Sequence, residues 1–287
     1  MKTIIVPTDF SAISNNAIDY AIDLAKATGS SILLFHAYQV PVSMTDVPIV
    51  LLSVEDLQKS NESKMDDVKK SVQERTGNSI KIYAETKLGD TVDELEDVCA
   101  KVKPFAVVMG TKGATGMERV LFGSTTLTTI RHLNWPVIVV PPGKKYSTIR
   151  KIGFACDFRE VVHTTPTHFI KDFVKEFNAE LHVLNVDRES KVLSAETYEQ
   201  SELLRNMIAD MNPQYHFIDK EDIEEGLNET GGSINDISTI HSQMDKDSGT
   251  SSIPLDSRQS KNRNIDLNEI DKIQNDILKT LKRLGSS

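Results

Sequence analysis

The stretch VVMGTKGATGMERVLFGSTTLTTIRHLNWPVIVV, residues 107–140, decides the fold of this chain. It opens with a short apolar run that suits a buried strand and then passes through three glycines. Gly123 precedes a helical run that begins near Ser124, and Pro136 introduces a second apolar strand over Val137–Val140. This order of elements is typical of α/β sheets that bind a phosphate: a strand, a glycine-rich loop, the start of a helix and a further strand.

The glycines of this stretch could serve a ligand or only a turn. Gly110 and Gly113 fall at the end of a strand, where a Cβ would keep a ligand away from the backbone. A helix that starts after Gly123 presents unpaired N–H groups and the positive end of its dipole, which favour an anion. Ser124 also suits the N-cap position, so a capped helix after a loop explains the same residues without a ligand. The glycine spacing matches neither a Walker motif nor the dinucleotide fingerprint.

Three motifs in this chain resemble those of the universal stress protein family. Residues 110–124, with Gly-x-x-Gly, nine residues and Gly-Ser, resemble its ATP-binding signature. Residues 6–11, VPTDFS, resemble its opening strand and loop, and residues 136–140, PVIVV, resemble its last strand. The resemblance covers residues 1–143. It implies an α/β fold with a doubly wound parallel five-stranded sheet (adenine nucleotide alpha hydrolase-like), strand order 3-2-1-4-5, and ATP as the ligand, with Mg²⁺ as a candidate companion ion.

The same resemblance assigns the binding residues. That strand order places the first and fourth strands side by side, so Asp9 and Gly110 would meet at the carboxyl edge of the sheet, where such folds bind ligands. The assigned residues are Pro7, Thr8, Asp9, Ala37, Met109, Gly110, Gly113, Gly123, Ser124 and Thr125. The glycines would admit the phosphates, and Asp9 would lie near the ribose or hold Mg²⁺. A turn aspartate that only bonds its own backbone stays open as the alternative for Asp9.

Other residues of this half have weaker assignments. Ser124 and Thr125 would donate hydroxyl and N–H groups to phosphate, and Ala37 would contact the adenine. Lys112 and Arg119 could neutralise phosphate charge, although solvated loop charges explain them equally well. No general base is evident beside an attack site, so we expect slow hydrolysis or none, and we assign neither a catalytic residue nor a permanent metal ligand.

Composition limits the partners of the chain. A net charge of −9 argues against nucleic acid and anionic membranes as partners. The 287 residues allow two domains, and a hydrophobic content of 39% predicts a polar region somewhere in the chain. Two cysteines make no disulfide framework, and no leader or membrane span is evident, so a cytoplasmic location is expected. Cys99 lies on the apolar side of a predicted helix and is expected to pack rather than react.

Elements alternate along the first half, as in a parallel sheet with crossover helices. Expected strands cover residues 3–6, 32–37, 80–84, 105–109 and 137–140, and expected helices follow Ser11 and Ser53 and cover residues 90–103. Asp56 is expected to act as a capping partner of Ser53. Residues 40–52 are expected to form a loop over the mouth of the site.

The second half repeats the start of the chain. Residues 152–158 align with residues 4–10, and residues 179–186 align with residues 30–37, which indicates a tandem duplication. Asp157 could repeat the role of Asp9, but no second Gly-x-x-Gly loop occurs, so no second nucleotide site is assigned. The group Cys156, Asp157, His163 and His168 matches no zinc spacing, and a metal there is disfavoured.

The second copy then loses its pattern. We expect neither a fourth nor a fifth strand after Glu229, which would leave an open edge beside the first strand of this copy. Expected domains are residues 1–145 and a partial copy at 146–229. A flexible linker is expected at 230–264, followed by an amphipathic helix at 265–285 that is either native or a fused segment.

The function that follows is a stress-response-type ATP-binding protein that acts by nucleotide-dependent interaction with an unidentified protein partner. One alternative is a scaffold of the same fold that binds no nucleotide. A second is an ATP-consuming enzyme of related fold, although the histidine-containing phosphate motif of such enzymes is missing. Self-association is expected through Val137–Val140 or through the tail helix.

Overall fold

The computed structural model describes residues 2–40, 53–113, 120–121, 123–156, 158, 160–187, 195–219 and 237–240. The chain divides into two compact units. Unit 1 comprises Met1–Gly113, Leu121–Arg150 and Asp172–Ala179, and unit 2 comprises Ala114–Val120, Lys151–Lys171 and Glu180–Ser287. The expected loop at residues 40–52 falls almost entirely outside the described residues, and the expected tail helix at 265–285 does so completely.

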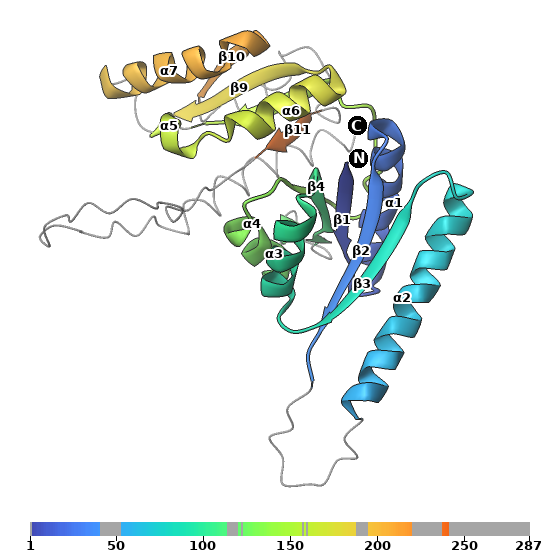
Figure 1. Ribbon diagram of the computed structural model, residues 1–287. Coiled ribbons are helices and arrows are strands. Elements are labelled where there is room, and N and C mark those ends of the chain that lie inside the picture. Colours follow the sequence, from blue (N-terminus) through green and yellow to red (C-terminus); the bar gives the residue numbers. More distant parts are fainter. Residues whose placement is uncertain are drawn as a thin grey trace, which may run out of the picture. The chain divides into compact units, whose positions relative to one another are not determined.

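A five-stranded parallel sheet forms the centre of unit 1, in the order β3-β2-β1-β4-β7. Its strands are β1 Thr3–Pro7, β2 Ser31–Tyr38, β3 Ile82–Leu88, β4 Ala106–Gly110 and β7 Val137–Val140. The helices are α1 Ala12–Thr28, α2 Val54–Thr76, α3 Thr91–Val102 and α4 Ser124–His132. Helices α1 and α2 cover one face and α3 and α4 the other (Figure 1). The predicted fold class and the predicted strand order are confirmed.

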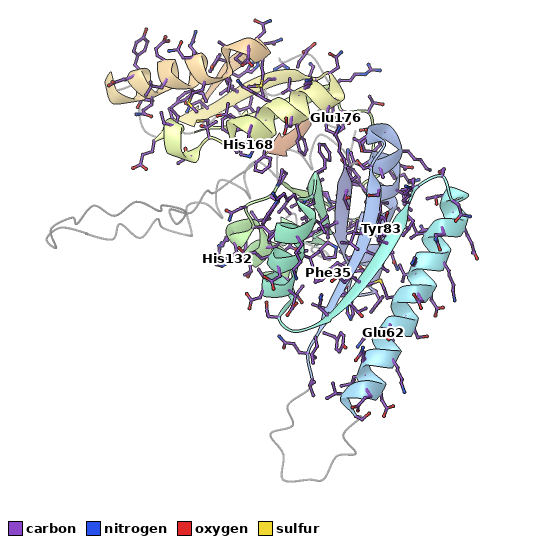
Figure 2. The ribbon with its side chains drawn as sticks, in the orientation of Figure 1. Phe35, Glu62, Tyr83, His132, His168 and Glu176 are labelled. Carbon is purple, nitrogen blue, oxygen red and sulfur yellow. The ribbon has the colours of Figure 1, made fainter. Side chains whose placement is uncertain are left out.

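Both faces of this sheet are buried because its central strands are apolar on both sides. Ile4 and Val6 of β1 join the core cluster beneath α1 and α2. Ile5, between them, joins the cluster beneath α3, together with Phe35 of β2 and Met109 of β4. Phe35 has no exposed surface and is marked in Figure 2. This two-sided packing fixes the strand register and therefore the positions of the loops at the carboxyl edge.

The predicted N-caps of α1 and α2 are present. Ser11 is the N-cap of α1, where its hydroxyl accepts a hydrogen bond from the Ser14 N–H, and Gly29 closes the helix with φ of 63°. Ser53 is the N-cap of α2 and accepts from the Asp56 N–H at 3.1 Å. Its hydroxyl also donates to the Asp56 carboxylate at 2.9 Å, so the predicted capping partnership is confirmed.

Two short strands lie within the glycine-rich stretch, where only a loop was expected. They are β5 Lys112–Gly113 and β6 Val120–Leu121. Residues 114–119 between them, including Gly116 and Arg119, fall outside the described part of the chain.

The second half of the chain contains a four-stranded parallel sheet in the order β10-β9-β8-β11. Its strands are β8 Lys151–Ala155, β9 Glu180–Asp187, β10 Gln214–Asp219 and β11 Ile237–Ile240. The helices of this half are α5 Val161–Thr164, α6 Thr167–Phe177, α7 Ala195–Ile208 and the 3-10 turn η1 Ala209–Met211.

The expectation that this copy lacks a fourth strand was wrong. Strand β11 pairs in parallel with β8 from Ile237↔Lys151 to Ile240↔Phe154, within the range expected to be a flexible linker. The edge of β8 that was expected to be open is therefore occupied. A run of four residues inside a polar segment has too little periodicity to be recognised, and its pairing with β8 supplies the backbone hydrogen bonds that make it a strand.

Candidate functional site

The winding of unit 1 reverses between β1 and β4. The chain passes from β1 outward to β2 and β3, and then crosses back through α3 to β4 on the other side of β1. The register Ile4↔Ala106 and Ile5↔Val107 brings the carboxyl ends of the two strands together. Such a switch point, with its two diverging loops, is where open α/β sheets bind ligands.

Thr8, directly after β1, organises the first of these loops. Its N–H donates to the Phe35 carbonyl at 2.8 Å, and its carbonyl oxygen lies 2.7 Å from Nδ1 of His36. Its buried hydroxyl donates to the Ser14 hydroxyl at 3.0 Å and accepts from the Phe10 N–H at 3.0 Å. These four contacts tie the loop to β2 and to the first turn of α1, so Thr8 holds the loop and does not offer its hydroxyl to a ligand.

Asp9 is exposed beside Thr8, at the edge of the sheet. One carboxylate oxygen accepts a hydrogen bond from the Ser11 N–H at 3.1 Å, so the local turn that the sequence left as an alternative is present. Partial burial acts to raise the pKa of this carboxyl group, but hydrogen bonds from the Ser11 side chain and backbone outweigh it and lower the pKa. Asp9 is therefore an exposed, ionised carboxylate at the switch point.

Gly110 ends β4 and packs directly against α1. A Cβ on this glycine would lie 2.6 Å from Cγ2 of Ile13 and 2.7 Å from the Ile13 carbonyl oxygen. The sequence suggested that the missing Cβ serves a ligand, and the structure shows that it serves the contact between β4 and α1. The Thr126 hydroxyl donates to the Gly110 carbonyl at 3.2 Å, which brings the first turn of α4 to the end of β4.

The start of α4 differs from the expectation at one residue. The N-cap is Gly123, with φ −64° and ψ 149°, and its carbonyl accepts the Leu127 N–H at 3.0 Å. The predicted cap Ser124 is instead the first helical residue, because the helical hydrogen bonds already begin at Gly123. Among the described residues, no side chain forms an N-cap hydrogen bond to this helix. Ser124 and Thr125 are exposed on this first turn, where their N–H groups can meet an anion.

The remaining predicted residues lie at the same edge in different environments. Pro7 is buried as the last residue of β1, and Ala37 is half-buried near the end of β2. The Met109 side chain is 6% exposed and packs with the core beneath α3, so only its backbone could contact a ligand. Gly113 lies in β5, beyond Gly110.

Three residues of this region were missed by the sequence reasoning: Ser14, His36 and Thr126. A hydroxyl three positions after the Ser11 cap was a possible signal for Ser14. The roles of the other two depend on contacts with distant residues, Thr8 and Gly110, and carry no local signal.

Potential metal ligands lie scattered over the described residues. Within them, no group of three or more His, Cys, Asp or Glu side chains is placed to hold a metal ion. The Lys112 and Arg119 side chains, Asp157, and the His163 side chain fall outside the described part. Among the helices that the structure describes, none combines the length and the apolar character needed to cross a membrane.

The loops after β1 and β8 share a hydrogen-bonding scheme. The Cys156 N–H donates to the Leu184 carbonyl at 2.9 Å, and the Asn185 side chain donates to the Cys156 carbonyl at 2.8 Å. The Phe158 N–H donates to the Cys156 sulfur at 3.4 Å. Cys156 thus makes counterparts of three of the four contacts that Thr8 makes in unit 1. Phe158 has a left-handed φ of 54°, as Phe10 has one of 65°.

Comparison with known proteins identifies the class of this fold. The sequence profile described as the universal stress protein family matches residues 1–141. Universal stress protein MJ0531 of Methanocaldococcus jannaschii is 34% identical over 152 residues, which cover 50% of this chain and 84% of that protein. Universal stress protein MJ0577 of the same organism is 29% identical over 160 residues, or 48% of this chain and 94% of that protein.

A solved structure extends the similarity into the second half. The crystal structure of a universal stress protein from Archaeoglobus fulgidus superposes with a TM-score of 0.59 at 18% identity, and it covers 80% of this chain and 84% of that one. This likeness concerns the fold. The relative that is 34% identical, of which 84% is covered, shows that the chain belongs to the universal stress protein family, and the profile match over residues 1–141 agrees with this.

Proposed function

We propose that unit 1 binds an adenine nucleotide, most simply ATP, at the carboxyl edge between β1 and β4. The observation that carries this proposal is the meeting of two loops at one switch point: the Asp9 loop after β1 and the start of α4, which the Thr126–Gly110 hydrogen bond holds beside β4. The family resemblance of the glycine motif supplies the identity of the ligand.

The chemistry of the two loops suits the two ends of a nucleotide. Anionic phosphates would accept hydrogen bonds from the N–H groups of Ser124 and Thr125, at the positive end of the α4 dipole. The ionised carboxylate of Asp9 would accept from ribose hydroxyls or contact a Mg²⁺ ion that accompanies the phosphates. The Thr8 hydrogen bonds would keep this loop in place before the ligand arrives.

We propose a holding role and not a hydrolytic one. The described residues at this edge present Asp9 as an ionised carboxylate with a lowered pKa, which is a poor general base near neutral pH. Nucleotide occupancy would then change how the protein binds partners in a stress response. A cytoplasmic location stays the expectation from the sequence.

One observation favours the scaffold that binds no nucleotide. Gly110 is already explained by its packing against Ile13, so one glycine of the motif needs no ligand.

Calorimetry decides between the two functions: the full chain is titrated with Mg-ATP at pH 7.5, and one binding event per chain is expected. Absence of binding at millimolar ATP would reject the nucleotide and leave the scaffold.

Variants test the assigned site. Asp9→Asn is expected to weaken ATP binding at least about tenfold, because a lost charge-assisted hydrogen bond costs about 1.5–3 kcal/mol. Gly113→Val is expected to weaken ATP binding as well, because the added side chain would keep the phosphates away from the backbone. Asp66→Asn, an exposed aspartate on α2, is the matched control and should bind like the parent. Equal affinity in all three variants would refute the assigned loops. ADP release followed over hours separates a holder from a hydrolase.

Self-association is part of the same proposal. β7 pairs with β4 and ends the order of the five-stranded sheet, so Val137–Val140 is an edge strand. A second copy of the chain could extend the sheet there. Light scattering at high concentration should then give a dimer, and a strictly monomeric mass would count against it. We also propose that the chain is a tandem duplication with domains at residues 1–145 and 146–229.

A further inference from the structure

Two histidines on adjacent strands of the second sheet form a pair in which His182 is buried and His216 is half-buried. Nδ1 of His182 on β9 lies 2.9 Å from Nε2 of His216 on β10, and the residues are 34 positions apart in the sequence. The rings stack with centroids 5.2 Å apart and an interplanar angle of 21°. His182 is only 2% exposed. This hydrogen bond joins β10, which ends the order of its sheet, to its neighbour β9.

The two sheets differ sharply at these positions. Both sheets pair their first strand with their second, Ile4 with Ile32 and Ile152 with Leu181. In this register His182 takes the place that Leu33 has in unit 1, where Leu33 packs in an apolar cluster. A buried aliphatic side chain at this position needs no partner, whereas a buried imidazole must be hydrogen-bonded.

Two charged side chains act on the pair among the residues that the structure describes. Glu180, on the same strand as His182, has a carboxylate oxygen 3.4 Å from His182 Nε2, but this nitrogen lacks the geometry of a hydrogen bond. Lys151 of β8 pairs in register with Glu180 and adds positive charge near both rings.

These neighbours select one arrangement of protons. The Glu180 carboxylate favours a hydrogen on Nε2 of His182, which leaves Nδ1 as the acceptor for the Nε2–H of His216. A first added proton can sit on Nδ1 of His216 without loss of this bond. A second proton must go to Nδ1 of His182, where it would place two donors face to face at 2.9 Å.

We propose that the His182–His216 pair is an acid-sensitive link between the edge strand β10 and its neighbour β9. The link holds β10 on β9 while the pair carries at most one added proton, and β10 is released when the pair takes up two. The link would make the second sheet of this protein open in response to acid. It is independent of the nucleotide site.

The direction of the pH dependence follows from the surroundings. Burial lowers the pKa of His182, Glu180 acts against this, and Lys151 adds to it. Burial, His182 and Lys151 lower the pKa of His216. Both rings therefore bind protons less readily in the closed sheet than in the open one. The stability of the pairing is complete above the ordinary histidine pKa of about 6.5 and is lost as the pH falls below it.

Amide hydrogen exchange on the full chain tests the proposal. Protection factors, corrected for intrinsic exchange rates, are compared at pH 7.5 and pH 5.5. Protection of β10 should fall about tenfold if opening takes up one proton, and up to about a hundredfold for two. β3, one of the two edge strands of the five-stranded sheet in unit 1, is the internal reference and should change much less. An equal change in β10 and β3 would overturn the proposal.

Variants separate the pair from general acid sensitivity. His182→Leu with His216→Gln should remove most of the pH dependence of β10 protection, whereas His132→Gln, an exposed histidine on α4, should leave it unchanged. A double variant that keeps the full acid response overturns the link. If the double variant fails to fold, ring titration of the parent chain by NMR decides, because two rings that titrate at or above pH 6.5 contradict the proposal.

Discussion

Replacement of Gly110 by alanine tests whether this glycine serves packing. The added Cβ would lie 2.6 Å from Cγ2 of Ile13 and 2.7 Å from the Ile13 carbonyl oxygen. The φ of Gly110 lies outside the left-handed region, so the penalty is a steric clash and not backbone strain. Because the carbonyl oxygen belongs to the backbone of α1, strand and helix must move apart. Overpacking of this kind costs about 1–3 kcal/mol in the free energy of unfolding.

The single tryptophan of the chain provides the assay. Trp135 packs against the core cluster that contains Met109, so its fluorescence reports the unfolding of unit 1. Urea denaturation of Gly110→Ala should show a lower midpoint than the parent, with little change in slope.

A double variant separates the two contacts that the added Cβ would make with Ile13. Ile13→Ala removes the Cγ2 atom but leaves the carbonyl oxygen, so Ile13→Ala in the Gly110→Ala background should recover only part of the loss, measured against Ile13→Ala alone. A loss below about 0.5 kcal/mol for Gly110→Ala, within the range of an ordinary surface substitution, would refute the packing role of this glycine.

Three further predictions follow from unit 1. Ser11→Ala removes the N-cap of α1 and should lower the free energy of unfolding by about 1 kcal/mol in the same urea assay, and an unchanged midpoint would contradict it. Burial, with a smaller effect from Glu96, raises the pKa of Cys99 to about 12. Iodoacetamide at pH 8 should therefore label this thiol only after unfolding. Equal labelling rates in the folded and the unfolded chain would contradict this prediction. The Asp9 carboxyl group should titrate below pH 3.8 by NMR, and Ser11→Ala should move the titration midpoint of Asp9 upward. Because the pKa of Asp9 is lowered in the folded chain, Asp9 contributes to stability above pH 3.8, and this contribution is lost as the pH falls through the lowered pKa.

Much of unit 1 could be predicted because its signals are local. Short β-branched runs such as Thr3–Val6 are typical of buried strands, and Ser11 and Ser53 start helices through bonds to their own first turns. The parallel order then places Asp9 beside the end of β4 without knowledge of any side-chain contact. The carboxyl edge as the location of the candidate site is a prediction from topology alone.

The features that sequence could not provide depend on partners far along the chain. Gly110 has no room for a Cβ because Ile13 lies against it, and no local sequence pattern indicates that contact. Strand β11 is a strand because β8 supplies its hydrogen bonds. The His182–His216 bond joins residues from two strands whose exact register must be known. In each case tertiary pairing, and not propensity, decides the outcome.

The proposed binding of an adenine nucleotide at the edge between β1 and β4 can be followed residue by residue. Backbone amide shifts of the isotope-labelled full chain during a titration with Mg-ATP test it most directly. Saturable shifts should be concentrated at Asp9, Gly110, Ser124 and Thr125, with little change along β8, β9 and β10. Saturable shifts centred on any other part of the chain, or no shifts at millimolar ATP, would contradict it.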